Sequence, residues 1–179
     1  GESVGRPVFA VEVEVVDDDD VPLPAGMIGR LRYRGPGVAT AYHRDPEASL
    51  EAFRQGWFYP GDLAEIDAQG FVTLKGRAKD MIIRGGINIY PADVEAALTA
   101  HPAVAEAAVV GWPSKEFGEE IAAFVRLSAP ADEASLIAFA SAQLARAKWP
   151  RAVFIVADLP KNSAGKVLKR DLVGRLTQL

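Results

Sequence analysis

The sequence changes character at residues 76–95, GRAKDMIIRGGINIYPADVE. Before this stretch, short alternating segments and turn residues predict strands and turns, and after it strand and helix patterns alternate. Three charged residues, Arg77, Lys79 and Asp80, stand at the change itself, and an apolar triplet and the pair Gly85-Gly86 follow. This layout is typical of a joint between two structural units, with functional residues close to the joint.

The part before the joint predicts a β-rich unit. Residues 8–16 and 27–34 alternate between apolar and charged side chains, which indicates half-buried strands. Asp45-Pro46-Glu47 predicts the start of a short helix, and residues 63–67 and 71–75 predict a β-hairpin. The apolar side chains expected to point inward are Phe9, Val11, Val13, Val15, Met27, Leu31, Tyr33, Leu50 and Phe53, with Arg30, Arg32 and Arg34 pointing outward.

The part after the joint predicts an α+β unit. Its expected elements are a helix that Pro91 opens, strands at 103–110 and 121–127, a helix from Asp132 to about Ala147, a strand at 152–157 and a last helix from about Lys169. Together the two parts predict an α+β fold with a β-rich unit over residues 1–78 and a second unit over residues 79–179.

Composition excludes several classes of function. The formal charge of −4 over 179 residues argues against a general nucleic-acid binder. Without cysteine there can be no disulfide, Cys-based zinc site or thiol nucleophile. No apolar run is long enough for a membrane span, and no signal-peptide pattern is present, so we expect a cytoplasmic protein. Because no initiator methionine precedes Gly1, the sequence is expected to be a piece of a larger protein.

Metal sites are not predicted either. Only two histidines occur, His43 and His101, and both stand beside turn residues far apart in the sequence. The four aspartates at 17–20 resemble a cation site, but they lack the glycine hinge and the distal glutamate of a calcium loop. Followed by Pro22, Pro24 and Gly26, they indicate a solvated connection instead.

Three charged side chains could carry chemistry. Asp62, in a tight aromatic turn, could accept two hydrogen bonds from a vicinal diol or could cap that turn. Arg77 could reach the same diol or a phosphate, or form a surface ion pair. Lys166 lies on a loop of small residues that could carry its ammonium into a site, or it could be one of several exposed lysines beside Lys161 and Lys169. The residues alone leave each pair of alternatives open.

Four segments taken together resemble a known family. They are GWFYPGD at 56–62, GRAKD at 76–80, GGINIYPADVE at 85–95 and PKNSAGK at 160–166. In this order and spacing they resemble the C-terminal third of acyl-adenylate-forming enzymes, which include acyl- and aryl-CoA synthetases, luciferase and peptide-synthetase adenylation domains. Residues 29–48 also look like the family's Arg-Gly-Pro…Tyr…Pro-Glu-Ala segment, so the resemblance covers nearly the whole chain.

The resemblance implies a domain organisation. Residues 1–78 would be the last β-rich, distorted barrel-like subdomain of a large adenylating domain. Residues 79–179 would be a mobile C-terminal domain with an antiparallel sheet flanked by helices. Lys79, with Asp80, matches the hinge about which that domain rotates.

The resemblance also implies site roles by position. Asp62 matches the aspartate that holds the ATP ribose, and Arg77 the arginine that assists it. Lys166 matches the lysine that contacts the carboxylate and α-phosphate during adenylation. Arg84, Gly85, Gly86 and Asn88 match the loop that lines the pantetheine tunnel of CoA.

The implied activity is a cytoplasmic AMP-forming acid–thiol ligase of the kind found in fatty acid metabolism. A carboxylic acid and ATP would give acyl-AMP and pyrophosphate, and CoA would then take the acyl group. The family's phosphate loop, Mg²⁺ ligands and acyl pocket would lie upstream, so the chain is expected to work with an upstream large domain and to be inactive alone. The alternatives are a unit that loads a carrier protein and a non-catalytic module that binds CoA or a carrier.

Three further points follow from the resemblance. Pro60 stands where the family usually has Thr or Ser, so a hydroxyl near the nucleotide is missing. The run from Gly85 to Pro91 looks more like CoA synthetases than like peptide-synthetase domains. Lys166 also looks like the lysine that acetylation silences in bacterial relatives, which would be a regulatory modification.

Overall fold

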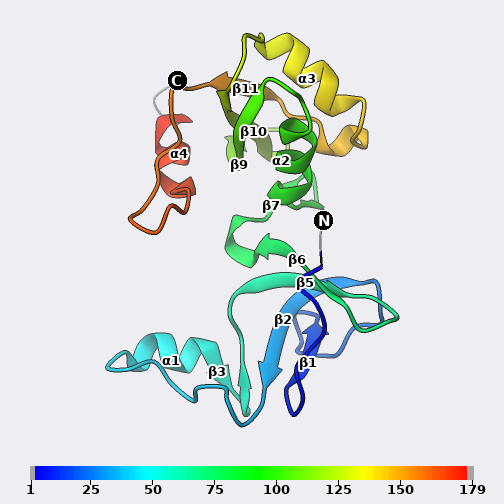
Figure 1. Cartoon of the computed structure of the whole chain (residues 1–179), viewed down its shortest axis with the longest axis vertical. Coiled ribbons are helices and arrows are strands. Elements are labelled where there is room, and N and C mark those ends of the chain that lie inside the picture. The colour runs from blue at the N-terminus through cyan, green and yellow to red at the C-terminus, as the bar shows by residue number, and fades with distance from the viewer. Residues whose placement is uncertain (1–2, 177–179) are drawn as a thin grey trace. The chain divides into compact units, whose positions relative to one another are not determined.

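The computed structural model describes residues 3–176 and divides the chain into two compact units. Unit 1 runs to Lys79, and unit 2 begins at Asp80. Figure 1 shows that unit 1 consists mainly of strands, whereas unit 2 combines strands and helices, so the α+β fold class is confirmed. No helix in the described part of the chain has the length and hydrophobicity needed to cross a bilayer.

Unit 1 is built on one antiparallel sheet. Its elements are β1 (Glu12–Val16), β2 (Ile28–Arg34), α1 (Pro46–Ala52), β3 (Phe53–Arg54), β4 (Trp57–Phe58), β5 (Asp62–Ile66) and β6 (Val72–Arg77). The strands pair in the order β3-β4-β2-β5-β6, and β1 also pairs with β2. The expected barrel-like shape is corrected to an open sheet, because no pairing among the described strands joins the two ends of this order.

The alternating patterns of residues 8–16 and 27–34 predicted strands longer than those observed, β1 and β2. Residues 9 and 10 form a turn in which Ala10 has a φ of 66°, so β1 begins at Glu12 and Phe9 is fully exposed instead of pointing inward. Met27 precedes β2 and is also exposed, as is Leu50 on α1. The start of α1 is confirmed, since the Asp45 side chain accepts a hydrogen bond from the Ala48 amide and Pro46 opens the helix.

Arg32 differs most from the sequence expectation in this unit. It was expected to point to solvent, but it is only 8% exposed. Its guanidinium donates to Glu14 and, at 3.1 Å, to the Tyr59 hydroxyl, and it lies over the Trp57 ring. These partners compensate the buried charge, and the hydrogen bonds raise the pKa of Arg32 although burial opposes them.

Unit 2 has a five-stranded sheet with helices on both faces. After the short 3-10 turn η1 (Ala78–Asp80), its elements are β7 (Ile82–Arg84), β8 (Ile87–Ile89), α2 (Pro91–Thr99), β9 (Val104–Ser114), β10 (Gly118–Leu127), α3 (Glu133–Ser141), the 3-10 turn η2 (Arg146–Lys148), β11 (Ala152–Ile155) and α4 (Lys169–Leu176). The strand order is β11-β10-β7-β8, with β9 paired to β10. The sheet is not purely antiparallel, because β11 runs parallel to β10.

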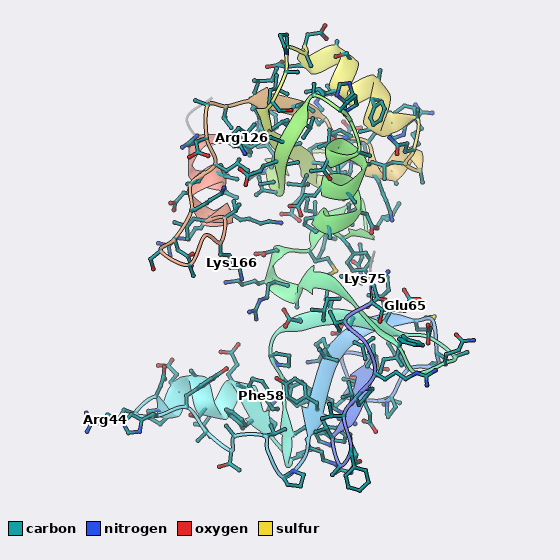
Figure 2. All side chains as sticks on the ribbon, in the orientation of Figure 1. Arg44, Phe58, Glu65, Lys75, Arg126 and Lys166 are labelled. Atoms are coloured by element: carbon teal, nitrogen blue, oxygen red, sulfur yellow. The ribbon has the colours of Figure 1, made fainter. Side chains whose placement is uncertain are left out.

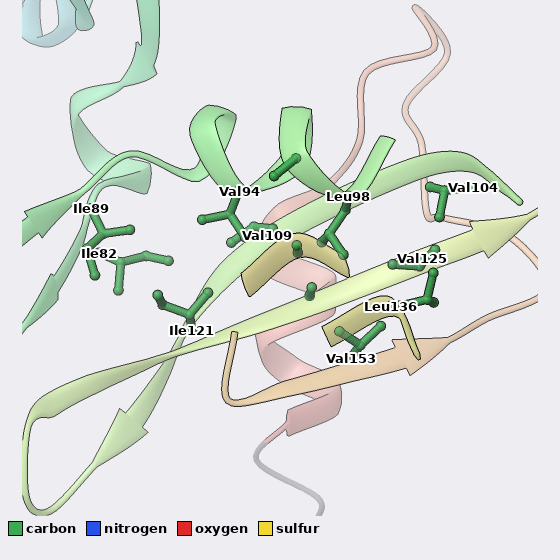
Figure 3. Packing of buried hydrophobic residues seen from close by; sticks show 13 residues of the cluster. Ile82, Ile89, Val94, Leu98, Val104, Val109, Ile121, Val125, Leu136 and Val153 are labelled. Carbon is green, nitrogen blue, oxygen red and sulfur yellow. The ribbon is translucent and has the colours of Figure 1, made fainter. Parts of the chain in front are cut away.

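Alternate residues of the two longest strands, β9 and β10, contribute to two separate cores. On one face, Val109, Ile121 and Val125 pack with side chains of α2 and α3, as Figure 3 shows. On the other face, Val110 and Phe124 pack with α4. Because successive side chains of a strand point to opposite faces, a sheet covered on both sides needs the continuous apolar runs seen in β9 and β10.

Two boundaries in unit 2 differ most from those expected. The strand expected at 103–110 continues through Gly111, Trp112 and Pro113 to Ser114 as β9, which forms a long hairpin with β10. The helix from Asp132 was expected to reach Ala147, but α3 ends at Ser141 and η2 follows. Leu144 still packs against the core that α3 covers, so helical spacing there reflected burial and not a continuous helix.

Candidate functional site

Asp62 and Arg77 lie side by side in unit 1. Asp62 begins β5 and Arg77 ends β6, and the two are direct partners across the strands. The Arg77 Nε lies 3.1 Å from the Asp62 carboxylate, and its Nη1 donates to the Pro60 carbonyl. The Ala78 amide also donates to the Gly61 carbonyl at 2.9 Å. Arg77 therefore fixes the turn that presents Asp62, while the carboxylate stays partly open to solvent.

Aromatic side chains cluster in the segment that leads into this turn. Trp57 and Tyr59 are buried. The Phe58 ring packs edge-on against the Tyr33 ring, with 5.1 Å between the ring centroids, and stacks on the Phe53 ring, with 4.7 Å between the centroids. Burial raises the pKa of Tyr33, and the nearby Asp62 carboxylate raises it further. Tyr33 is thus a neighbour of Asp62 that the sequence pattern, which only placed it inward, did not identify.

The Gly85-Gly86 pair forms the tip of the β7–β8 hairpin in unit 2. Both residues have positive φ, 56° and 80°, as a two-residue hairpin turn of type I′ requires, and glycine adopts such angles without strain. The Gly85 amide donates to the Phe117 carbonyl at 2.9 Å, which ties the tip to the loop between β9 and β10. Asn88, on β8, is exposed.

Arg84, which precedes the glycines, is held by three contacts. It forms a 2.7 Å ion pair with Glu120, donates to the Ala147 carbonyl at 3.0 Å and lies over the Phe117 ring. Glu120 belongs to β10 and Ala147 to η2, so Arg84 links the hairpin to two other parts of unit 2.

A cavity of about 650 Å³, which was not among the sequence-based expectations, opens beside this hairpin. Three arginines and two aromatic side chains contribute to its wall, and no acidic residue does. Its lining residues are Arg84, Gly85, Ile87, Phe117, Arg146, Ala147, Trp149, Pro150 and Arg151. The signal that could have revealed it is the basic and aromatic run RAKWPR at 146–151, which was interpreted only as the end of a helix. Such a wall suits a ligand with phosphates and a flat ring.

Lys166 lies on the loop between β11 and α4, at the position labelled in Figure 2. Its two neighbouring lysines are paired: Lys161 with Glu106 at 2.6 Å and Lys169 with Glu95 at 2.8 Å. The ammonium of Lys166 is exposed and has no ion-pair or hydrogen-bond partner among residues 3–176. Of these three cations, Lys166 is therefore the one free to meet a ligand.

The structure brings five of the expected site residues together in two groups, and across residues 3–176 no hydrogen bond or ion pair of the Lys166 side chain joins it to either group. Asp62 and Arg77 form one group in unit 1, and Arg84, Gly85 and Gly86 form another in unit 2. Lys79 and Asp80 lie in η1, where unit 1 ends and unit 2 begins. Among the residues described, no three His, Cys, Asp or Glu side chains gather in a way that could hold a metal ion.

Comparisons with known proteins agree on one family. Residues 93–166 match the AMP-binding enzyme C-terminal domain. The chain is 41% identical over 171 residues to a long-chain-fatty-acid–CoA ligase of Escherichia coli, covering 95% of this chain and 30% of that protein. It is 42% identical over 172 residues to a 2-succinylbenzoate–CoA ligase of Geobacillus kaustophilus, covering 95% of this chain and 35% of that protein.

Solved structures agree with these relatives. ATP-bound MatB from Rhodopseudomonas palustris matches with a TM-score of 0.90 and 40% identity, over 97% of this chain and 35% of that one. The o-succinylbenzoate CoA synthetase of Bacillus subtilis, in complex with its acyl-adenylate intermediate, matches with a TM-score of 0.90 and 36% identity, over 95% of this chain and 35% of that one. The chain spans about a third of the length of these relatives. Residues 93–166 therefore belong to the AMP-binding enzyme C-terminal domain family, and the chain is similar to the C-terminal portion of acyl-adenylate-forming CoA ligases.

Proposed function

We propose that this chain is the C-terminal part of an ATP-dependent acyl-CoA synthetase. The observation that carries the proposal is that nearly the whole chain, 95% of it, aligns at about 40% identity with proteins named CoA ligases. In the proposed reaction, a carboxylate oxygen attacks the α-phosphorus of ATP, and pyrophosphate leaves. The thiol sulfur of CoA then attacks the acyl carbon of acyl-AMP, loses its proton and displaces AMP.

Asp62 and Arg77 are assigned to the nucleotide. A carboxylate can accept hydrogen bonds from both ribose hydroxyls, and the Arg77 contacts with Asp62 and Pro60 keep that carboxylate in place. Lys166 is assigned to adenylation, because an unpaired ammonium can stabilise the negative charge that develops between the carboxylate and the α-phosphate. These roles need ATP and a carboxylic acid, and both are substrates of the proposed enzyme.

The basic cavity of unit 2 is assigned to CoA. Its arginines suit the phosphates of CoA, and Phe117 and Trp149 offer flat surfaces for the adenine ring. The proposed pantetheine path starts beside it, at Arg84, Gly85 and Gly86, with Asn88 on the following strand. Glycine is useful in such a path because a backbone without side chains lets a thin ligand pass closely.

The two half-reactions require different parts of unit 2, namely the Lys166 loop for adenylation and the Gly85-Gly86 hairpin for thioester formation. We therefore propose that unit 2, mobile about Lys79 and Asp80, presents one and then the other to unit 1 and to an upstream large domain. Mg²⁺ would neutralise phosphate charge when bound, and we assign no residue of this chain to it. A cytoplasmic location and a role in fatty acid metabolism belong to the same proposal.

The decisive experiment separates the half-reactions in the full-length protein that carries this sequence. Pyrophosphate release is measured against a panel of carboxylic acids, with and without CoA, for the wild type and for Lys166→Ala. We expect one class of acid to give CoA-dependent turnover. Lys166→Ala should lose adenylation by about 100-fold or more, the size seen when one charge-stabilising group is removed, while it still converts supplied acyl-AMP.

Other outcomes would redirect the proposal. Turnover that uses only a carrier-protein thiol would replace CoA with a carrier as the acceptor. An unchanged Lys166→Ala variant would remove Lys166 from the reaction. The purified 179-residue chain is expected to release no pyrophosphate, and acid-dependent release from it would contradict the need for an upstream domain.

A second acceptor has structural support. The amide bond synthetase McbA from Marinactinospora thermotolerans matches this chain with a TM-score of 0.90 and 37% identity, so an amine acceptor is compatible with this fold. The same assay distinguishes an amine acceptor from CoA, because an amine-dependent turnover would need neither CoA nor the basic cavity. Arg146→Ala would then leave the rate unchanged, whereas it should raise the KM for CoA in the synthetase.

A further inference from the structure

The loop that carries Lys166 is organised by one side chain, that of Asn162. Its Oδ1 accepts hydrogen bonds from two backbone amides, that of Ala164 at 3.0 Å and that of Lys166 itself at 2.9 Å. The backbone of Asn162 completes the arrangement, since its amide donates to the Lys166 carbonyl and its carbonyl accepts from the Gly165 amide, both at 2.9 Å. Asn162 thus contacts both backbone polar groups of Lys166.

Packing anchors only the two ends of this loop. Every residue from 161 to 166 is exposed, whereas the flanking Leu159 and Val167 pack into the core beneath α4. The turn instead includes a positive φ of 79° at Gly165, and it is closed by the bridge between Lys161 and Val167. In the absence of burial, local side-chain to backbone hydrogen bonds decide the shape of such a turn.

The base of the loop is fixed to the sheet by charge. Lys161 Nζ lies 2.6 Å from Glu106 Oε1 on β9, and Glu106 Oε2 in turn accepts from Arg126 Nε on β10 at 2.9 Å. These two contacts, Lys161 first and then Arg126, lower the pKa of Glu106. The residue before Asn162 is therefore tethered, and the Asn162 side chain sets how the chain continues to Lys166.

We propose that Asn162 is the positioning residue of Lys166: its side-chain oxygen fixes the Lys166 backbone so that the ammonium projects in one direction from the loop. The inference rests on the proposed role of Lys166 in adenylation. Asn162 does not need to touch any substrate for this. Its effect is expected on the rate of adenylation and not on substrate binding, because Asp62 and Arg77 lie in unit 1 and do not depend on the loop.

The first test measures the loop directly in the 179-residue chain. Water-exchange NMR reports the rate at which each backbone amide exchanges its proton. In Asn162→Ala we expect the amides of Ala164 and Lys166 to exchange about tenfold faster, as the loss of a hydrogen bond allows. Asn162→Asp keeps the accepting oxygen and should keep both amides protected. Ser163→Ala is the matched control, since the Ser163 hydroxyl has no hydrogen-bond partner among residues 3–176.

The second test measures chemistry in the full-length protein. Asn162→Ala should lower the kcat of adenylation by about tenfold, with the KM for ATP and acid unchanged and the conversion of supplied acyl-AMP unchanged. Ser163→Ala should match the wild type in the kcat of adenylation, in the KM for ATP and acid, and in the conversion of supplied acyl-AMP.

Two results would overturn the proposal. One is an unchanged exchange rate at the Lys166 amide in Asn162→Ala. The other is a wild-type adenylation rate for Asn162→Ala in a protein whose Lys166→Ala variant is inactive. If Lys166→Ala itself kept its adenylation rate, the proposed role of Lys166 would fail first, and with it the reason to position this lysine.

Discussion

At the scale of single residues, Asp62 gives the most direct test of nucleotide binding. Hydrogen bonds to a charged group contribute about 1.5–3 kcal/mol each, which corresponds to about tenfold or more in kcat/KM. We expect the wild-type full-length protein to prefer ATP over 2′-deoxy-ATP by about that factor. Asp62→Ala should use both nucleotides with a similar and lower kcat/KM, because the carboxylate that accepts a hydrogen bond from the ribose 2′-hydroxyl has been removed. Steady-state kinetics with the two nucleotides check this.

The control for Asp62 lies on the same strand. Glu65, labelled in Figure 2, pairs with Lys75 at 3.0 Å and belongs to β5 as Asp62 does. Glu65→Ala also breaks an ion pair of the sheet, but it should keep the preference for ATP over its deoxy analogue. If Asp62→Ala kept this preference as well, the carboxylate would not contact the ribose.

The sequence alone could name individual charges but not their partners. It left open whether Lys166 differs from Lys161 and Lys169, because the glutamates that pair with the latter two come from strand β9 and helix α2, more than 50 residues away. Arg32 was assigned to solvent by alternation, since nothing local reveals that Glu14, Trp57 and Tyr59 converge on it. Both the pairing of these lysines and the burial of Arg32 therefore depend on partners that are distant in sequence.

At the scale of elements, Glu106 connects two strands and the Lys166 loop. Its pKa is lowered from an ordinary 4.5 by Lys161 and Arg126. A depressed pKa in the folded state stabilises the fold above the ordinary pKa, and this contribution is lost as pH falls through the lowered value. We expect the stability difference between wild type and Glu106→Gln to be constant above about pH 5.5 and to shrink as the pH falls below 4.5. Urea unfolding between pH 3 and 7 measures it.

An unpaired acid gives the comparison for Glu106. Glu133 lies in the first turn of α3, is exposed and has no ion-pair partner within residues 3–176. Glu133→Gln breaks no ion pair among these residues and is unfolded under the same conditions as the comparison. A difference for Glu106→Gln that stayed constant down to pH 3 would show that the Lys161 and Arg126 contacts do not stabilise the folded chain.

Elements with strong local signals were predictable, and elements decided by pairing were not. Asp45 and Asp132 cap helices in the structure as their sequence positions indicated, because capping needs only an acceptor two or three residues before the free amides. In contrast, β9 continues through Gly111 and Pro113 because β10 pairs with it along its whole length. The short strands β7 and β8 were missed because three residues are too few to show a period.

At the scale of the whole molecule, the proposed mechanism depends on a change of backbone angles at the junction. The sequence changes character near residue 78, and the two compact units meet after Lys79. Each unit has its own core, so rotation about the junction would leave both cores intact. A hinge needs only a few residues that can absorb the change in φ and ψ. The exposed Lys79 in the short turn η1 meets that requirement.

Lys79→Pro tests this mechanism because proline fixes its own φ near −65° and restricts the residue before it. If the two half-reactions need different angles at this position, only one of them can survive the substitution. We expect one half-reaction of the full-length protein to fall by about 100-fold or more while the other stays within a few fold of wild type. Acyl-AMP formation and the conversion of supplied acyl-AMP to acyl-CoA, measured separately, give the two rates.

Lys79→Ala separates the hinge effect from the loss of the charge, since alanine removes the ammonium and leaves the backbone free. It should keep both half-reactions near their wild-type rates. Proportional loss of both rates in Lys79→Pro would indicate a damaged fold, which the unfolding temperature would show independently. Two unchanged rates would mean that residue 79 does not move between the half-reactions. Asp80→Pro, compared with Asp80→Ala, would then decide whether the rotation is absorbed one residue later, at the first position of unit 2.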